Sequence, residues 1–194
     1  MVAEIISSLT ALGYRPLKGA LDKPLNCIEL DDQIKSALPD DYCAFLSAFP
    51  ETGVFDKQIV FSALEKSPWA ADGKEVLEVL YASCSDKNND LLTLRTQYAE
   101  QLPAHFFVIG QVTGANLVCI DLRNESRGKV YVWDHEHIDD AHGGLYWVAN
   151  DFSAFVDLLH VSEQATTIAS PKLVRMELSD VLKARVAELM KNKK

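Results

Sequence analysis

The 194-residue sequence predicts an α+β fold in which helices pack against a largely antiparallel sheet. Three observations lead to this prediction. Apolar residues recur at helical spacing in much of the first half of the chain. After Pro103 the pattern changes to short segments of branched and aromatic residues, separated by connections too short for crossover helices. A helical pattern returns directly after the last of these segments, so a helix should close over the sheet.

Two helices are expected near the N-terminus. Residues 2–12 carry apolar side chains at helical spacing, and Gly13 follows as a typical C-terminal cap. The stretch LPDDYCAFLSAFP places Pro39 and two aspartates in a first helical turn, where they suit its free N–H groups and positive dipole end. This helix should dock on the core along an apolar stripe formed by Tyr42, Phe45, Leu46 and Phe49.

The middle of the chain mixes both patterns. Residues 53–64 favour one or two strands around a polar turn at residues 56–58. Residues 74–84, KEVLEVLYASC, fit either a strand or a helix. The stretch NNDLLTLRTQYAEQLP has a clear helix signature, with Asn89 or Asp90 as the cap and Pro103 as the stop.

The remaining elements are four strands and two helices. The segments HFFVIG, NLVCIDL, GKVYVWDHE and LYWVAN are expected to form an antiparallel meander, with Trp133 and Trp147 in the core. The stretch DFSAFVDLLHV begins with an acidic cap and supplies the closing helix. Residues 166–194 are expected to be a linker and a basic amphipathic C-terminal helix, which leaves residues 1–165 as the main domain.

Charge is distributed unevenly and limits the classes of partner. The net charge is −9, and from residue 172 onward there are seven basic and three acidic residues, so the preceding body carries −13 and the tail +4. A body this acidic repels phosphate backbones, which argues against direct nucleic-acid binding, and attracts basic protein surfaces. No apolar stretch reaches the ~18 residues of a membrane helix, and the N-terminus has no basic leader, so a cytoplasmic protein is expected.

The cysteines are expected to be reduced. Cys27, Cys43, Cys84 and Cys119 are widely spaced, form no CxxC pair and mostly have apolar neighbours, so neither disulfides nor a cysteine zinc site is predicted. A nucleophilic pair of Cys119 with His135 is conceivable, but a buried strand thiol is the better interpretation. The sequence has none of the common catalytic signatures, so no catalytic residue and no cofactor is predicted.

The segment WDHEHIDDAH, residues 133–142, has the composition of a metal or acid/base site. On an extended strand His135, His137 and Asp139 would share one face and supply a possible zinc or iron ligand set. The turn-rich continuation argues against this, because the strand should end near residue 138 and Asp139 would then leave the shared face. His142 is the weakest candidate ligand. The favoured interpretation is a solvated acidic rim at the sheet edge, formed by Asp134, Glu136, Asp139 and Asp140.

Four segments together resemble the SUKH superfamily, whose members include fungal cell-wall synthesis regulators and many bacterial immunity proteins. LPDDYCAFLSAFP is similar to the family's LP-x-x-Y-x-x-F-L helix, and HFFVIGQVTGANLVCIDL to its hairpin with an IG strand end and a C-x-D strand. GKVYVWDHE resembles the G-x-V-Y-x-W-D-H-E strand, and VANDFSAFVDLL the terminal helix, with Asp151 where the family favours serine. The resemblance covers residues of about 35–160 in the family's order.

The resemblance implies a mixed, largely antiparallel sheet packed with helices, and a domain that binds a protein without catalysis. The leading hypothesis is an immunity protein that neutralises a toxin, for example a basic nuclease, by masking its surface. Asp134, Glu136, Asp139 and Asp140 are the predicted part of the partner surface, because loops at a sheet edge can vary without unfolding the core. Two alternatives stay open: a regulatory or scaffold protein on the same fold, and a metal-dependent hydrolase that uses His135, His137 and Asp139. The oligomeric state is not predicted.

Overall fold

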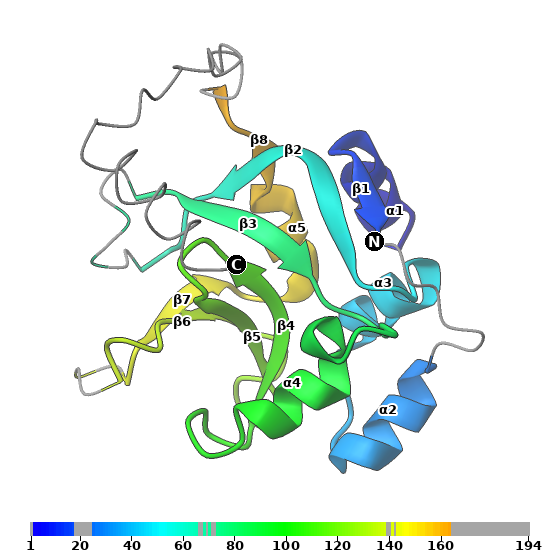
Figure 1. Ribbon diagram of the computed structural model, residues 1–194, viewed down its shortest axis with the longest axis vertical. Helices are drawn as coiled ribbons and strands as arrows, with labels where there is room; N and C mark the ends of the chain where they lie inside the picture. The colour runs from blue at the N-terminus through cyan, green and yellow to red at the C-terminus, as the bar shows by residue number, and fades with distance from the viewer. Residues whose placement is uncertain are drawn as a thin grey trace, which may run out of the picture. The chain divides into compact units, whose positions relative to one another are not determined.

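The computed structural model describes residues 2–17, 25–65, 68, 70, 73–138, 141 and 143–163. Short helices and strands make up this part of the chain, with four successive strands in its second half (Figure 1). In chain order they are α1 Val2–Ala11, β1 Tyr14–Pro16, α2 Cys27–Ile34, α3 Asp40–Ala48, β2 Gly53–Phe61, β3 Glu75–Leu80, the 3₁₀ helix η1 Lys87–Asn89, α4 Leu91–Gln97, β4 Phe106–Val112, β5 Leu117–Asp121, β6 Val130–Trp133, β7 Leu145–Ala149, α5 Phe152–Leu158 and β8 His160–Val161. None of these helices combines the length and apolarity needed to cross a membrane.

The strands form one antiparallel sheet in simple sequence order, from β1 to β7, and β8 pairs with β2 on the edge opposite β3. Among the described residues, parallel pairing is limited to isolated bridges, such as the one between Glu51 and Ser83. The predicted α+β class and the predicted meander of β4 to β7 are therefore confirmed. Short connections produce this order, because antiparallel neighbours can be joined by a tight turn.

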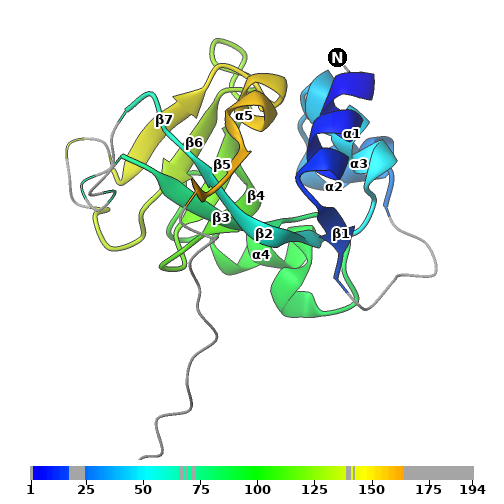
Figure 2. The same cartoon turned by 90° about the horizontal axis from the view of Figure 1, so that it is seen from above.

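One face of the sheet is covered by α3 and α5, on which α1 also packs (Figure 2). Aromatic rings join these layers: Tyr42 of α3 lies 6.5 Å from Phe107 of β4 and 5.1 Å from Phe152 of α5, measured between ring centroids. Phe61 of β2 and Phe155 of α5 meet edge to face at 5.2 Å. Each fully buried phenylalanine contributes about 1.5–3 kcal/mol, so this aromatic layer is a major source of stability.

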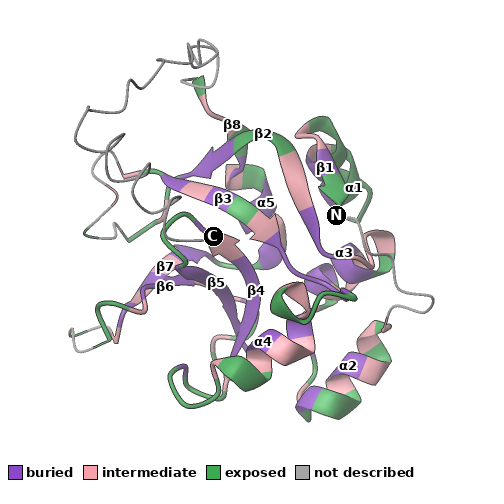
Figure 3. Ribbon diagram, in the orientation of Figure 1, coloured by how far each residue is buried: buried purple, intermediate pink, exposed green. Residues whose placement is uncertain are grey.

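The opposite face receives less cover. Only α4 packs there among the described helices, and the ring of Tyr98 at its C-terminal end meets Trp133 of β6 at 5.9 Å. Burial is almost continuous along β4 and β5 (Figure 3), so the centre of the sheet is closed on both sides. Part of β6 and β7 extends beyond α4, and this is where the candidate surface lies.

Side-chain caps define where the helices begin. Asp90 accepts a hydrogen bond from the Thr93 N–H at the start of α4, and Asp151 accepts one from Ala154 at the start of α5, both as expected. Pro39 immediately precedes α3 instead of lying in its first turn. The Asp41 carboxylate is buried and accepts a 2.8 Å bond from the Ser153 N–H, so it also ties α3 to α5.

Gly110 allows β3 and β4 to approach each other closely. A Cβ atom at this position would lie 2.7 Å from the carbonyl oxygen of Val79, which is closer than real Cβ atoms come to other atoms. The β4 pairings also change register on both sides of Gly110. The IG pair expected at a strand end therefore lies inside β4, which continues to Val112, and Gly110 marks a site that excludes any side chain.

Several sequence-based expectations need correction or completion. Residues 53–61 form a single strand whose pairing with β3 is irregular between Val54 and Ile59, so the predicted polar turn lies inside a strand. The ambiguous stretch 74–84 supplies strand β3. The predicted C-terminal helix lies outside the described residues.

The expectation of four reduced cysteines is wrong for two of them. Cys27 at the start of α2 and Cys43 in α3 form a disulfide, with their Cα atoms 5.6 Å apart. The capping box at Asn26 and Glu29 begins α2 next to α3, which brings the two thiols together. Sequence spacing did not reveal this proximity. Cys84 and Cys119 are free and buried, as predicted.

Candidate protein-binding surface

The WDHE segment is folded back onto the sheet. Trp133 is fully buried at the end of β6, and the Asp134 N–H donates a 2.8 Å hydrogen bond to the carbonyl of Gly144. The Asp134 carboxylate accepts from the Glu136 N–H at 2.8 Å and contacts Nδ1 of His137. Asp134 is only 2% exposed, so the expectation that it emerges into solvent is wrong. The turn closes over the carboxylate because these donors satisfy it internally.

The four predicted partner-binding residues therefore have different environments. Glu136 is exposed, as an acidic rim requires, while Asp134 is interior and supports the turn. Asp139 and Asp140 lie outside the described residues, as does His142. A contribution of these four residues to binding stays a prediction, with Glu136 the member that the structure places at the surface.

The two described histidines of this segment bond to protein groups. Nδ1 of His135 lies 3.0 Å from the amide oxygen of Asn116, and Nδ1 of His137 contacts Asp134. Within the ranges that the structure describes, no three His, Cys, Asp or Glu side chains are arranged to hold a metal ion. Asp139, the third ligand of the metal hypothesis, is not among those residues, so that hypothesis gains no support.

The proposed Cys119 nucleophile is not poised for chemistry. Cys119 is fully buried in the middle of β5, and burial raises the pKa of its thiol far above the usual range. The thiol therefore stays protonated near neutral pH, whereas nucleophilic cysteines need thiolate character. Nδ1 of His135 is bonded to Asn116, so His135 is not assigned as the base for the Cys119 thiol.

The uncovered part of the sheet carries an open hollow of about 550 Å³. Phe106 of β4, Tyr131 of β6, and Leu145 and Trp147 of β7 line its floor. The register places Tyr131 opposite Trp147, and Phe106 meets Tyr131 edge to face at 5.3 Å. Ile138, 41% exposed, adds an apolar group from the turn after β6. We call this region the aromatic hollow.

Trp147 is held in place from three sides. Its backbone N–H donates to the Glu65 carboxylate and its carbonyl accepts from the Glu65 N–H, both at 2.9 Å. Its indole N–H donates to the carbonyl of Ala149 at 3.0 Å, and the Lys129 Nζ lies 5.0 Å from the ring centroid. The prediction of Trp147 as a core residue is therefore wrong. It is half-buried, and it presents a fixed aromatic ring to the hollow.

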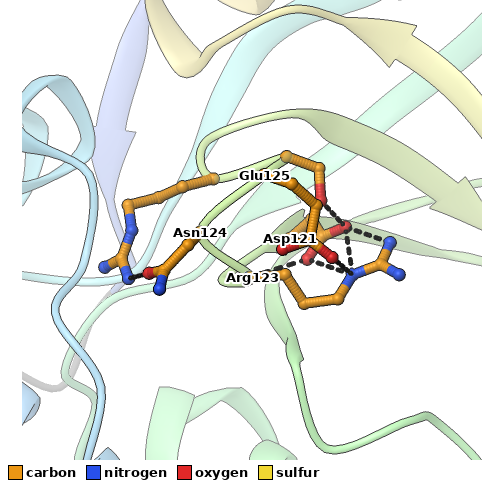
Figure 4. Close-up of polar contacts among 6 residues, drawn as sticks. Asp121, Arg123, Asn124 and Glu125 are labelled. Atoms are coloured by element: carbon orange, nitrogen blue, oxygen red, sulfur yellow. Dashed lines mark hydrogen bonds and ion pairs between the residues drawn. The ribbon is translucent and has the colours of Figure 1, made fainter.

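Arg123 borders the aromatic hollow and is anchored by a buried acid (Figure 4). Asp121 is fully buried and accepts from Nη2 of Arg123 at 2.6 Å, from the Arg123 N–H at 2.9 Å and from the Ser126 hydroxyl at 2.7 Å. Burial alone would raise the pKa of Asp121, but the bonds from Arg123 and Ser126 outweigh it and hold that pKa below its usual value. The pair therefore stays ionised and fixes the turn after β5.

Comparison with known proteins settles the family. The model of the SMI1 / KNR4 family (SUKH-1) matches residues 28–158. The chain belongs to this family. It is also 30% identical over 138 residues to the SPbeta prophage-derived uncharacterized protein YokK of Bacillus subtilis (strain 168), an alignment that covers 66% of this chain and 69% of that protein.

Sequence reasoning found the SUKH strands that carry the hollow but missed the hollow itself. Its signal was present in the alternation of β6 and β7, which places Tyr131, Leu145 and Trp147 on one face. What was missing was the extent of α4, which covers Trp133 but leaves Trp147 open. Which side chains of a face stay accessible depends on the partner layer and is not visible in the strand pattern.

Proposed function

We propose that this SUKH-1 protein is a non-catalytic protein-binding module that acts as an immunity protein, neutralising a toxin by masking its surface. The observation that carries the proposal is the aromatic hollow. It combines a half-buried tryptophan and tyrosine with lysine and arginine at its border. Interfaces are enriched in tryptophan, tyrosine and arginine, and aromatic anchors at their centre supply most of the binding energy.

Two further points support the immunity role. The family includes bacterial immunity proteins by the resemblance described above, and the similar Bacillus subtilis protein is named as prophage-derived. The acidic body would steer a basic toxin toward the chain. We propose that Glu136, Asp139 and Asp140 take part in this steering, with Asp134 holding their turn. Charge reversal at Glu136 and Asp139 should then slow association at low salt, and an unchanged rate would remove them from the interface.

The test uses the whole chain as bait in an extract of its source cells, followed by co-expression with the captured protein. A toxin partner should inhibit growth alone and lose that effect when the chain is present. Trp147→Ala should weaken binding at least about 30-fold, the size of a central aromatic anchor. Ile28→Ala is the matched control, because Ile28 is a 75% exposed apolar residue of α2 outside the hollow. Equal affinity of the two variants would exclude the aromatic hollow as the binding site.

The regulatory alternative predicts a different result from the same experiment. A captured protein that does not inhibit growth, together with a gene that has no toxin gene beside it, would favour a regulator or scaffold on this fold. Either outcome keeps protein binding as the activity, and only the biological role changes.

A further inference from the structure

A second hollow adjoins the aromatic hollow and differs from it in charge. It has a volume of about 560 Å³ and lies where the C-terminal end of α2, α4 and the turn between β5 and β6 meet. The two hollows share His105 and Arg123. Figure 1 shows α2 and α4 side by side, and a bond from Arg95 to the carbonyl of Ile34 joins them. We call this region the basic hollow.

Positive charge is concentrated at these two hollows. The described part of the chain contains nine lysines and arginines against 21 aspartates and glutamates, yet five of the nine line one or both hollows. Among the described residues that line the basic hollow, one is acidic, Glu125. Its cationic residues are Lys35, Arg95, Arg123 and Arg127. A cluster of this kind inside an acidic protein is unexpected if charge serves solubility alone.

Most of this positive charge is not neutralised by carboxylates. Arg127 donates to the carbonyl of Ala37 at 2.6 Å and to the Asn124 amide oxygen at 2.8 Å, both uncharged acceptors. Arg123 is the exception, because Asp121 pairs with it. Glu125 also lies within 3.9 Å of Arg123, but the lining of the hollow still carries four cations against this one carboxylate. An incoming anion would therefore meet an excess of positive formal charge in the lining.

Arg95 is the least satisfied of these cations. Its guanidinium lies 5.6 Å from the ring centroid of Phe107, and its hydrogen bond to the Ile34 carbonyl is long, at 3.4 Å. Its Nη1 is buried and has no hydrogen-bond partner in the part of the chain that the structure describes. Burial lowers the pKa of Arg95, which indicates that its charge is partly desolvated without compensation. Buried donors of this kind are normally paired, so Arg95 keeps hydrogen-bonding capacity that the described residues do not use.

Lys35 provides independent support from backbone geometry. It ends α2 in the left-handed region, with φ of 54° and ψ of 38°, where glycine or asparagine is normally found. A lysine there carries a conformational cost. The helix dipole favours a cation anywhere in the last turn of α2, but it does not explain a cation at the residue with the left-handed backbone conformation. Strained residues of this kind are concentrated at functional sites.

We infer that the basic hollow binds a short acidic segment of a protein partner, whose carboxylates pair with Lys35, Arg95 and Arg127. This rests on the proposed protein-binding function and adds the chemistry of one part of the partner. The segment continues past Arg123 and places an apolar side chain in the aromatic hollow. A nucleic acid fits less well, because its phosphates would extend beyond these hollows over the acidic body, which repels them.

The test measures fluorescence anisotropy of a fluorescein-labelled hexaglutamate peptide with the full chain, in low salt. Lys35→Asn with Arg127→Gln removes two charges and preserves the fold, because asparagine tolerates the left-handed conformation and glutamine can still donate to Ala37. The control pair, Lys57→Gln with Lys87→Gln, removes the same charge from exposed sites outside both hollows. Two lost exposed charge contacts should weaken binding about fivefold in the first pair and leave the control unchanged.

Each other outcome overturns the inference. Absence of peptide binding would do so, as would equal weakening by the control pair, which would indicate only a general charge effect. Tighter binding of a fluorescein-labelled hexathymidylate would assign the hollow to phosphate ligands instead. The Lys35→Asn, Arg127→Gln pair should keep the urea midpoint of the unchanged chain, which separates a loss of binding from unfolding. Capture of a natural partner that is unaffected by the Lys35 and Arg127 changes would reject the basic hollow and leave the proposed function standing.

Discussion

Replacement of Arg123 by alanine should destabilise the fold far more than replacement of Arg15, although both arginines form ion pairs. Asp121 is fully buried beside Arg123, whereas the side chains of Arg15 and Asp56 are 55% and 61% exposed. Arg123→Ala removes the countercharge and the guanidinium donors of a carboxylate that has no access to water. Arg15→Ala leaves Asp56 free to be hydrated. The comparison therefore isolates burial as the cause of the difference.

The expected magnitude follows from what remains around Asp121. Breaking a buried ion pair by removing one partner costs about 3–5 kcal/mol. The Arg123 backbone N–H and the Ser126 hydroxyl would still donate to Asp121, and the Arg123 side chain is itself 44% exposed. The cost should therefore lie below this range, at about 2–3 kcal/mol. For the exposed Arg15 pair the loss should be below about 1 kcal/mol, despite its short 2.5 Å separation.

Urea unfolding at pH 7, with the slope checked for equality among the variants, measures both losses. The double variant Asp121→Asn with Arg123→Ala should recover part of the loss, because no buried charge is then left unpaired. The reasoning would be refuted if the Arg123 and Arg15 variants differed by less than about 0.5 kcal/mol, the usual scatter of surface substitutions.

Three other predictions test the fold and its chemistry. Hydrogen bonds depress the pKa of Asp121, so its charge should stabilise the native state at neutral pH and lose that effect as the pH falls below about 4. Asp121→Asn should therefore flatten the acid side of a plot of unfolding free energy against pH. Cys43→Ser should lower the free energy of unfolding by about 3 kcal/mol in oxidising buffer, from the 16-residue separation of the disulfide, and by nothing in excess dithiothreitol. Cys84→Ser, which removes a free thiol, should have the same effect in both buffers. Gly110→Ala should cost more than about 2 kcal/mol of unfolding free energy in urea, because its Cβ would contact Val79. Gly114→Ala, with no atom near its Cβ, should show only the strain of its positive φ. Equal costs would contradict the close approach of β3 and β4.

Local patterns account for the parts of the fold that sequence predicts well. The caps at Asp90 and Asp151 and the stripe of α3 act within a few residues, so their outcome depends little on the rest of the chain. The strands β4 to β7 were equally predictable, because each is a short run rich in branched or aromatic residues next to a turn. Strand β2 was less so. Its polar centre remains extended because the irregular pairing near Val54 absorbs the break in pattern.

Features that depend on distant segments were not predictable in the same way. The disulfide between Cys27 and Cys43 follows from the docking of α2 on α3, and the basic hollow requires α2, α4 and the turn after β5 to meet. Trp133 and Trp147 look alike in sequence, since both follow strand patterns. Contacts from distant segments distinguish them, since Tyr98 of α4 packs on Trp133 while Trp147 stays half-buried.

The buried Asp134 changes how the WDHE motif relates to binding. Its backbone bond to Gly144 and its carboxylate bond to Glu136 close the turn, and Gly144 has the positive φ of 74° that this close approach requires. Because the turn is closed, Ile138 and Gly143 lie against the aromatic hollow and complete its wall. The motif that identifies the family thus builds the frame of the hollow, while the groups offered to a partner come from residues around it. Under the proposed function, the WDHE turn would position the aromatic hollow, and the charges at Lys35, Arg95 and Arg127 would select the partner.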